Sequence, residues 1–545
     1  MKFDYKKYFP FPKIRKEQEE GIDFALDAFI NKGKKFVILE MGTGCGKSPL
    51  GVAVSQYMVN HHKPAETYSK GSWFLTTQKI LQDQYVKDFG PPRGKIVSIK
   101  SSSNYGCNFF KNNKCSESLQ LLKEADKDSK FYKSCSFNCK YKKTKRDFIS
   151  SHLSITNFPY FLTETAYVGL IQPRQFLVID ECHTIEDELS KFIEIVVSEK
   201  FASAILEIEM PLDMTDQESA FLWVKDTYKP ALCDSIAELE KEIKELQEAG
   251  QEDSDEAKRI STNQDRLNMH KSKIEKFLML YDSENWIFNF IPSWNKSGRK
   301  LEFKPIDIGM YAEEYLFKFG EKVLLLSATI LNKEAYCESV GIPLKDAEFI
   351  SIDSPFPIEN TPVIYFPVGS MSATNIDDTL PDMLNAIKAV LADHSKEKGV
   401  IHTRTFKIAK YIEENLNDKR LLFHSSDDRE EIIEKHMKSK KPTVLVSPSS
   451  TEGLDLKDDL SRFQIVCKIN WPYLGDRLVK SRMEKYRYWY AYQAVKSLIQ
   501  ARGRSIRTAE DYAVTYILDD SFEGLYSRNI RMFPKYFRKS LHMDL

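Results

Sequence analysis

The sequence predicts an α/β protein built on two parallel β-sheets, with two insertions in its first half. Short apolar runs alternate with helical spacing over residues 1–90, and a similar alternation begins after residue 357. Residues 100–150 and 190–300 break this pattern. A chain of 545 residues also exceeds what one hydrophobic core usually supports, so we expect several domains.

The first part of the chain has the elements of one parallel sheet. A buried-strand run at Lys35–Glu40 leads into a glycine-rich turn at Gly42–Lys47, and helical spacing follows at Pro49–Val59. The further strands predicted here are Ser72–Thr76, Phe176–Asp180 and Lys322–Ser327. Continuous apolar strands separated by helices indicate a parallel sheet that is covered on both faces.

Two stretches interrupt this sheet. Residues 100–150 are rich in Ser, Asn, Lys and Cys and show little periodicity, whereas residues 190–300 have mostly helical patterning. Dense Glu/Lys spacing at Ala237–Glu248 and Lys258–Leu278 predicts a solvated helical hairpin.

A second α/β pattern begins after Asp353-Ser-Pro-Phe-Pro, which has the composition of a loop. Its predicted strands are Val363–Phe366, Gly399–His402, Pro442–Val446, Gln464–Ile469 and Tyr512–Leu518.

Bulk composition fits a soluble globular chain. Hydrophobic residues make up 42% and charged residues 29%, and 79 Lys and Arg balance 79 Asp and Glu, so net charge does not indicate a polyanion partner. The N-terminus lacks the apolar core of a signal peptide, and no window is long enough for a membrane helix. We therefore expect a soluble cytoplasmic protein with no membrane partner. Nine cysteines, an odd number, argue against a disulfide framework.

The glycine-rich turn between the first strand and helix is a candidate phosphate site. The loop residues expected to cradle phosphates with their backbone N–H groups are Gly42, Thr43, Gly44, Cys45 and Gly46. Lys47 would reach the β- and γ-phosphates, and the Ser48 hydroxyl would bind Mg²⁺. Because Met41 stands where the first small residue of such a loop is expected, an accidental glycine turn is the alternative.

Acidic and basic residues far along the chain would complete a hydrolytic site. Asp180 would hold the Mg²⁺, and Glu181 would polarise the attacking water. Two acids that cap a helix are the alternative, which fits poorly beside a phosphate loop. Arg504 and Arg507 lie three residues apart, as on one helix face, and would stabilise charge on the transferred phosphate. An exposed basic helix face is the other interpretation.

Taken in order along the chain, these motifs resemble those of the superfamily 2 helicases. The loop is followed by Asp180-Glu-Cys-His183, Ser327-Ala-Thr329 and Gln500-Ala-Arg-Gly-Arg504-Ser-Ile-Arg507. Segments similar to motifs of the XPD/DinG branch are Tyr8–Gln18, Thr76–Gln84, Ser154–Tyr160, Lys304–Ile308, Ser354–Phe356 and Glu452–Asp455. The resemblance covers nearly the whole chain.

This resemblance implies two RecA-like motor domains with ATP and Mg²⁺ in the cleft between them. It places motor domain 1 at residues 1–100, 148–189 and 301–350, a cluster domain at 101–147, a helical arch domain at 190–300, and motor domain 2 at 351–545. It also implies catalytic roles for His183 and Gln500, and nucleotide contacts for Arg15, Gln18 and Asp455.

The activity implied is that of an ATP hydrolase and DNA helicase that moves 5′ to 3′ on single-stranded DNA and unwinds forked duplex in repair, replication or recombination. We expect a monomer, associated with the nucleoid or, if a phage encodes it, in the host cytoplasm. The alternatives are an ATP-switched single-strand clamp or translocase that does not unwind, and an RNA helicase. Departures from the usual motifs, at which we expect altered rates rather than lost activity, are Met41, Gly42, Cys45, Ser48 and Cys182.

Four of the nine cysteines fall in one short stretch, Cys107-x7-Cys115-x19-Cys135-x3-Cys139. By the resemblance they hold a [4Fe–4S] cluster, which thiolates bind in fours. A zinc site is the alternative, although only Cys135 and Cys139 have the spacing typical of a zinc pair, and four unrelated thiols are the remaining interpretation. The basic segment Lys140–Arg146 follows, and we expect it to contact phosphates and to stack its aromatic residue on bases rather than form a solubilising loop.

Overall fold

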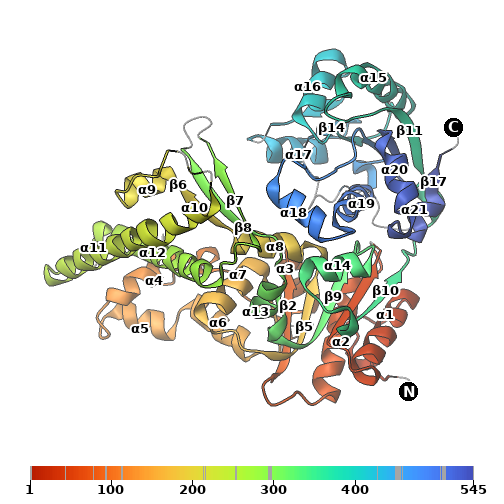
Figure 1. Ribbon diagram of the computed structural model, residues 1–545. Helices are drawn as coiled ribbons and strands as arrows, with labels where there is room; N and C mark the ends of the chain where they lie inside the picture. Colours follow the sequence, from red (N-terminus) through yellow and green to blue (C-terminus); the bar gives the residue numbers. More distant parts are fainter. Residues whose placement is uncertain are drawn as a thin grey trace.

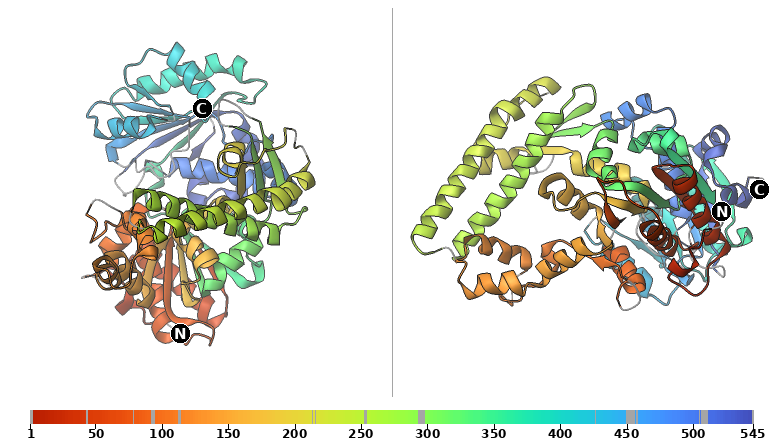
Figure 2. Two further views of the ribbon diagram at one scale, coloured as in Figure 1. Left: turned by 90° about the vertical axis from the view of Figure 1, so that its left-hand side faces the viewer. Right: turned by 90° about the horizontal axis from the view of Figure 1, so that it is seen from below.

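Two lobes and a projecting body of helices make up the chain (Figures 1 and 2). The computed structural model describes residues 3–42, 44–77, 79–91, 95–111, 114–212, 214, 216–251, 254–292, 298–425, 427–448, 456, 458–503, 505 and 511–543. Each lobe is built on one seven-stranded sheet among the described residues.

The first sheet is parallel throughout, with the strand order β10-β1-β9-β5-β2-β4-β3. Its strands are β1 (Phe36–Met41), β2 (Ser69–Thr76), β3 (Val97–Ser98), β4 (Leu153–Asn157), β5 (Arg174–Asp180), β9 (Gly320–Ser327) and β10 (Ala347–Ile352). Alternate side chains of β1 enter different cores, with Phe36 and Ile38 on one face and Val37 and Leu39 on the other. Burial on both faces is what the continuous apolar runs predicted.

Helices cover both faces of this sheet. On the Val37 face lie α1 (Lys16–Leu26), α2 (Lys47–His61) and α3 (Lys79–Phe89). On the Phe36 face lie α7 (Phe158–Thr163), α8 (Ile185–Ile193), α13 (Gly309–Tyr315) and α14 (Lys333–Val340).

The second sheet is also parallel, in the order β13-β14-β12-β15-β16-β11-β17. Its strands are β11 (Val363–Gly369), β12 (Gly399–His402), β13 (Leu421–Phe423), β14 (Val444–Ser447), β15 (Phe463–Val466), β16 (Val514–Asp519) and β17 (Leu541–His542). The helices of this lobe are α15 (Ile376–Asp393), α16 (Phe406–Asn415), α17 (Arg429–Lys438), α18 (Arg477–Lys485), α19 (Trp489–Arg502), α20 (Ser521–Arg528) and α21 (Lys535–Ser540). Two parallel-sheet lobes confirm the predicted fold class.

The first insertion is helical, although its sequence shows little periodicity. It contains α4 (Cys115–Glu124), α5 (Lys130–Phe137) and α6 (Lys140–Ser150). In α6 only Tyr141 and Phe148 are buried, two turns apart, so the apolar stripe is too sparse to stand out in the sequence.

The second insertion combines helices with a sheet that the sequence pattern did not predict. Its helices are α9 (Glu199–Ile205), α10 (Gln217–Trp223), α11 (Lys229–Glu248) and α12 (Asp255–Leu280). The antiparallel strands β6 (Ile195–Ser198), β8 (Lys300–Pro305) and β7 (Trp286–Ile291) lie in that order. The long hairpin of α11 and α12 reaches back to α4, so the two insertions meet away from the lobes (Figure 2). No helix in the described part of the chain is both long and apolar enough to cross a membrane.

Candidate nucleotide-binding site

The loop between β1 and α2 has a backbone that requires glycine at two positions. Gly44 has φ +82° and Gly46 has φ +77°. A Cβ at Gly44 would lie 2.1 Å from the Phe356 ring, and one at Gly46 would lie 2.2 Å from Gln18 Nε2. Left-handed backbone and close neighbours exclude larger residues, as in a loop that turns its N–H groups inward.

Arg15 and Gln18, at the start of α1, contact the carbonyl groups of this loop. Arg15 Nη1 donates to Gly44 O at 2.6 Å, and Gln18 Nε2 donates to Gly46 O at 3.2 Å. The amide oxygen of Gln18 accepts from the Arg15 backbone N–H at 2.9 Å and fixes the side chain. Both residues therefore lie at the loop, and their contact with a nucleotide stays a prediction.

The two halves of the predicted Mg²⁺ site lie side by side. The Ser48 hydroxyl is 3.5 Å from Asp180 Oδ2, and Lys47 Nζ donates to Met41 O at 3.4 Å. A hydroxyl and a carboxylate are the oxygen donors that Mg²⁺ prefers. Sequence reasoning missed Tyr85, whose buried hydroxyl donates to Asp180 Oδ2 at 2.8 Å. The contact was missed because Tyr85 and Asp180 are 95 positions apart in the sequence and Tyr85 has the pattern of an ordinary core residue of α3.

Burial, followed by the charge of Glu181, raises the pKa of Asp180 to about 6. Lys47, the Tyr85 hydroxyl and the Glu181 backbone N–H partly oppose this rise. A divalent cation beside Asp180 would favour its ionised form, so the local electrostatics fit the predicted metal.

A chain of polar contacts runs from Glu181 to the second lobe. Glu181 has φ +54°, a left-handed conformation that is uncommon outside glycine. Its Oε2 lies 3.3 Å from His183 Nδ1, and the same nitrogen lies 2.9 Å from the Ser327 hydroxyl. Ser327 Oγ accepts from the Thr329 backbone N–H at 3.1 Å, and Gln500 Nε2 donates to Thr329 Oγ1 at 3.3 Å. The sequence-predicted His183 and Gln500 are thus linked through the Ser-Ala-Thr segment.

Glu40, at the end of β1, is a further buried residue that motif reasoning did not single out. One carboxylate oxygen accepts from the backbone N–H groups of Ile330 and Leu331, and the other accepts from the Ser351 hydroxyl at 2.7 Å. Burial raises the pKa of Glu40. The carboxylate therefore ties the strand before the predicted phosphate loop to the segment after Thr329.

Four predicted site residues lie outside the described part of the chain: Thr43, Asp455, Arg504 and Arg507. Helix α19 ends at Arg502, so Gln500 lies in its last turn and is described, whereas Arg504 and Arg507 are not.

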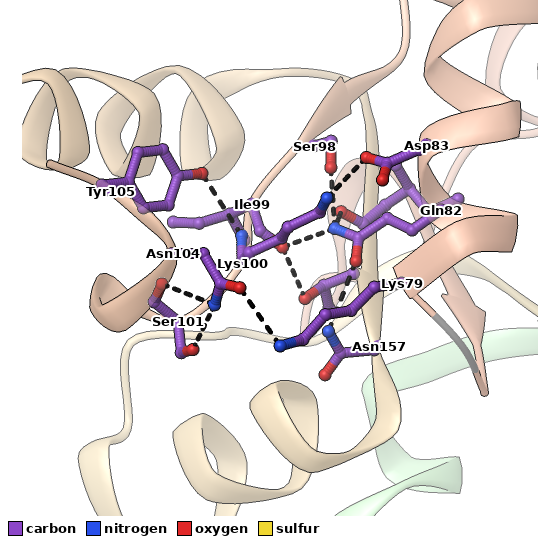
Figure 3. Close-up of polar contacts among 12 residues, drawn as sticks. Lys79, Gln82, Asp83, Ser98, Ile99, Lys100, Ser101, Asn104, Tyr105 and Asn157 are labelled. Carbon is purple, nitrogen blue, oxygen red and sulfur yellow. Dashed lines mark hydrogen bonds and ion pairs between the residues drawn. The ribbon is translucent and has the colours of Figure 1, made fainter. Parts of the chain in front are cut away.

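The segment similar to a strand-contacting motif, Thr76–Gln84, is bonded to the sheet edge by a buried amide (Figure 3). Gln82 Nε2 donates to Ser98 Oγ at 2.7 Å and to Ile99 O at 2.6 Å. Gln82 Oε1 accepts from Asn157 Nδ2 at 3.3 Å. One side chain thus joins α3, β4 and the chain that leads into the first insertion.

Two lysines on the surface of this region bond to side chains rather than to solvent alone (Figure 3). Lys79 Nζ donates to Asn104 Oδ1 at 3.1 Å, and Lys100 Nζ donates to Asp83 Oδ1 at 2.6 Å. These contacts position basic groups along the start of the first insertion.

The four clustered cysteines share one neighbourhood. Cys115 Sγ and Cys139 Sγ are 4.0 Å apart. Burial raises the pKa of the Cys115 thiol to about 12, and the neighbouring Cys139, Cys135 and Cys107 raise it further. Among the described residues, no group of three or more His, Cys, Asp and Glu side chains is arranged to hold a metal ion. The thiols therefore offer the donor atoms of a metal centre, which would stabilise their thiolates, without the geometry of a formed one.

The basic segment Lys140–Arg146 forms the start of α6 rather than a loop. Tyr141 is buried and packs on Tyr105 with 5.3 Å between ring centroids. The expectation that this aromatic ring stacks on bases is therefore wrong, because the ring belongs to the core. Lys145 bonds to the buried Glu164 at 2.7 Å, so part of the basic charge is also used within the protein.

Comparisons with known proteins agree with this arrangement. Residues 392–540 match the family described as helicase C-terminal domain, and residues 11–212 match the type III restriction enzyme res subunit. A probable ATP-dependent helicase of Methanocaldococcus jannaschii is 20% identical, and the match covers 96% of this chain and 94% of that protein. A solved XPD helicase has a TM-score of 0.63 at 17% identity and covers 96% of this chain and 98% of its own. For Xpd4 of S. tokodaii the TM-score is 0.56 at 14% identity, with 97% and 100% covered.

Proposed function

We propose that this protein, which has the fold of the XPD helicases and a match to the helicase C-terminal domain family, is a superfamily 2 helicase that moves 5′ to 3′ on single-stranded DNA and unwinds duplex with energy from ATP. The observation that carries the proposal is the meeting of Lys47, Ser48 and Asp180 at one end of the first sheet. A phosphate loop and a metal-binding carboxylate in this relation suit hydrolysis of a nucleoside triphosphate.

Each side chain has a defined task in that reaction. Lys47 would neutralise the β- and γ-phosphates, and Ser48 and Asp180 would hold the Mg²⁺, which would supply charge stabilisation to the transferred phosphate. Glu181 orients and polarises the attacking water, while His183 fixes the Glu181 carboxylate at 3.3 Å. Arg504 and Arg507 would approach the γ-phosphate from the second lobe.

Strand contact is proposed for the surface at the start of the first insertion. Lys79 and Lys100 are positioned there by Asn104 and Asp83. The neutral amide of Asn104 leaves the charge of Lys79 available to the phosphates of a single strand, whereas Asp83 balances the charge of Lys100. The contribution of Lys79 should weaken as salt rises.

Strand displacement tests the proposal. Anaerobically purified protein is given Mg²⁺, ATP and duplexes that carry either a 5′ or a 3′ single-stranded tail. Unwinding from the 5′ tail alone is the expected result. Unwinding from the 3′ tail alone would keep the motor and overturn its direction, and strand-stimulated ATPase without unwinding would indicate a translocase or clamp. Tails of RNA in the same assay test the RNA helicase alternative.

Replacement of the phosphate-binding lysine tests the site itself. Lys47→Ala removes the cation that neutralises the β- and γ-phosphates, so ATP turnover should be abolished. Lys63→Ala, in the exposed segment after α2, is the matched control and should hydrolyse ATP like the parent. Substantial ATPase in the Lys47→Ala variant would refute the assignment.

We also propose that Cys107, Cys115, Cys135 and Cys139 hold a [4Fe–4S] cluster. The sulfurs of Cys115 and Cys139 already lie 4.0 Å apart, and Cys135 packs with Phe131 in a small core separate from those of the lobes. Because so small a core gives little stability, a metal centre would brace the insertion. Anaerobic protein should contain about four irons and matching sulfide per chain. Stoichiometric zinc in place of iron would overturn this assignment.

A further inference from the structure

A buried carboxylate joins the two lobes at Glu186, three residues after His183. Glu186 lies in the first turn of α8 and is 3% exposed. Its Oε1 accepts from Arg482 Nη1 and from Trp489 Nε1, both at 2.8 Å. Its Oε2 accepts from Gln493 Nε2 at 2.9 Å. All three donors belong to α18 and α19 of the second lobe, which lie over α8 in Figure 1.

The remaining N–H groups of Arg482 donate to the first lobe and to the end of the three-stranded sheet of β6, β8 and β7. Its Nη2 donates to the Ser190 hydroxyl at 2.9 Å and to Pro305 O at 3.3 Å, and its Nε donates to Ile306 O at 3.0 Å. The side chain is as deeply buried as Glu186. One guanidinium thus connects α18, α8 and the end of β8, where the arch returns to the first lobe.

Stability alone is a weak reason for this joint. Burial raises the pKa of Glu186, and the positive charges of Arg482 and Lys496 oppose that rise. Desolvation offsets much of the attraction within a buried ion pair, so an apolar contact of equal volume would hold the lobes together as well. A fully bonded polar joint instead makes one relative geometry of the lobes far better than its alternatives.

Helix α19 contacts the first lobe at both ends. Trp489, its first residue, bonds to Glu186, and Gln500, in its last turn, bonds to Thr329. These contacts are separated by about 16 Å of helix at 1.5 Å per residue. Because a helix of this length is stiff, a displacement of the Gln500 end would rotate the helix about its Trp489 end.

We propose that Glu186 is a positioning residue and the pivot through which the nucleotide site controls the second lobe. It holds α18 and the start of α19 on the helix that follows Asp180 and Glu181 through three hydrogen bonds, whereas the Gln500 end is held by one 3.3 Å bond to Thr329, which a bound nucleotide would alter. This inference rests on the proposed motor function and adds the residue that couples hydrolysis to the strand.

ATPase stimulation by single-stranded DNA measures this coupling. For Glu186→Gln, the unstimulated kcat and the KM for ATP should match the parent, because the residue does not touch the nucleotide loop. The stimulation by oligodeoxythymidine should fall about tenfold, within the range typical of coupling between two sites. Unwinding should fall in parallel.

Two further variants separate coupling from simple support. Lys485→Gln breaks the partly exposed ion pair with Asp307, 3.2 Å long, on the same helix as Arg482 and should keep full stimulation. Gln493→Leu removes one donor to Glu186 and leaves the ion pair, so stimulation should fall by less than in Glu186→Gln. If Glu186→Gln does not fold, the Gln493→Leu measurement decides.

The outcomes distinguish this inference from the function on which it rests. A parent protein that hydrolyses ATP but ignores single strands refutes the proposed function, and the pivot with it. A parent that responds to strands, beside a Glu186→Gln or Gln493→Leu variant that responds equally, refutes the pivot alone. If Glu186→Gln lowers the thermal stability but leaves the stimulation of ATPase by single strands unchanged, the role of Glu186 is structural only, and the pivot is refuted.

Discussion

The hydroxyl of Tyr85 influences the charge of Asp180, although neither a motif nor a spacing connects the two residues. The buried hydroxyl donates to the carboxylate at 2.8 Å and so favours the ionised form, while burial and Glu181 raise the pKa of Asp180 to about 6. Below that pH, a proton would compete with the proposed Mg²⁺ for the same oxygens. The charge state of a residue that the sequence identifies is therefore adjusted by one that it does not.

The pH profile of kcat/KM for Mg·ATP should show this balance. Activity should fall as the pH drops below about 6, because protonated Asp180 cannot bind the cation. In Tyr85→Phe the ionised form loses a donor, so the acid limb should move to higher pH. Tyr490→Phe, whose hydroxyl donates to Pro472 O at 3.1 Å in the second lobe, is the control and should leave the limb in place. Superimposable profiles for parent and Tyr85→Phe would contradict this account.

At the scale of elements, single buried polar side chains hold helices to sheets. Gln82 bonds α3 to β4 and to the backbone at Ile99 (Figure 3). Elsewhere, His436 of α17 lies between Thr443 and Leu460. Such contacts fix the position of an element more strictly than apolar packing, because an unpaired buried polar group costs free energy.

Gln82→Leu should detach α3 from the sheet edge. The substitution removes the amide donor to Ile99 O and the acceptor of Asn157, and should lower the free energy of unfolding by about 1–3 kcal/mol. Chemical denaturation of parent and variant measures the difference. Gln84→Leu, on the exposed side of the same helix, should change stability little, and equal losses in the two variants would count against the role of Gln82.

His436 should make the second lobe sensitive to acid. Burial lowers the pKa of His436 from 6.5 to about 4, and the neutral ring is satisfied because one nitrogen donates to Leu460 O and the other accepts from the Thr443 hydroxyl. Since the folded pKa lies below the unfolded one, the stabilising contribution is complete above pH 6.5 and is lost as the pH falls toward 4. That loss amounts to about 3 kcal/mol.

Thermal unfolding midpoints recorded between neutral and acid pH check this prediction. His436→Gln should flatten the dependence on pH over that window. His61→Gln, at an exposed position of α2, should follow the parent curve. A His436→Gln curve as steep as that of the parent would assign the acid sensitivity elsewhere.

At the scale of the whole molecule, the two insertions lie outside the two lobes and contact each other through α4 and α12 (Figure 2). The residues proposed to bind the nucleotide lie at the end of the first sheet, whereas the clustered cysteines lie in the insertion. Loss of a proposed metal centre should therefore affect strand separation more than hydrolysis.

Cys107→Ser tests this separation of roles. The variant should lose iron and the brown colour of the anaerobic protein, lose unwinding, and keep part of its ATPase, because the motor site remains intact. Metal content, strand displacement and ATPase are measured on the same preparation. Cys233→Ser, in α11 and outside the cysteine cluster, should behave like the parent. Full unwinding by iron-free protein would contradict the proposed role of the cluster.

Local pattern predicted most of the two main sheets. The runs at Lys35–Glu40 and Phe176–Asp180 correspond to β1 and β5 within two residues, because a strand buried on both faces is apolar at every position. The sheet of β6, β7 and β8 was missed, since β6 and β7 lie within the stretch of mostly helical patterning, and β8, which begins at its end, buries only alternate residues. Helices α5 and α6 were missed because each buries only two residues, so their apolar stripes are short.

The sequence by itself determined the α/β class and the resemblance to the XPD branch, and it predicted the phosphate loop and the Asp-Glu pair, because each of these motifs consists of residues close together in the chain. Only the tertiary structure decided that Tyr85 bonds to Asp180 across 95 residues, that Tyr141 is buried, and that Glu186 meets Arg482 across 296 residues. Contacts of that separation arise when whole elements pack, and no local spacing encodes which buried donor will reach which buried acceptor.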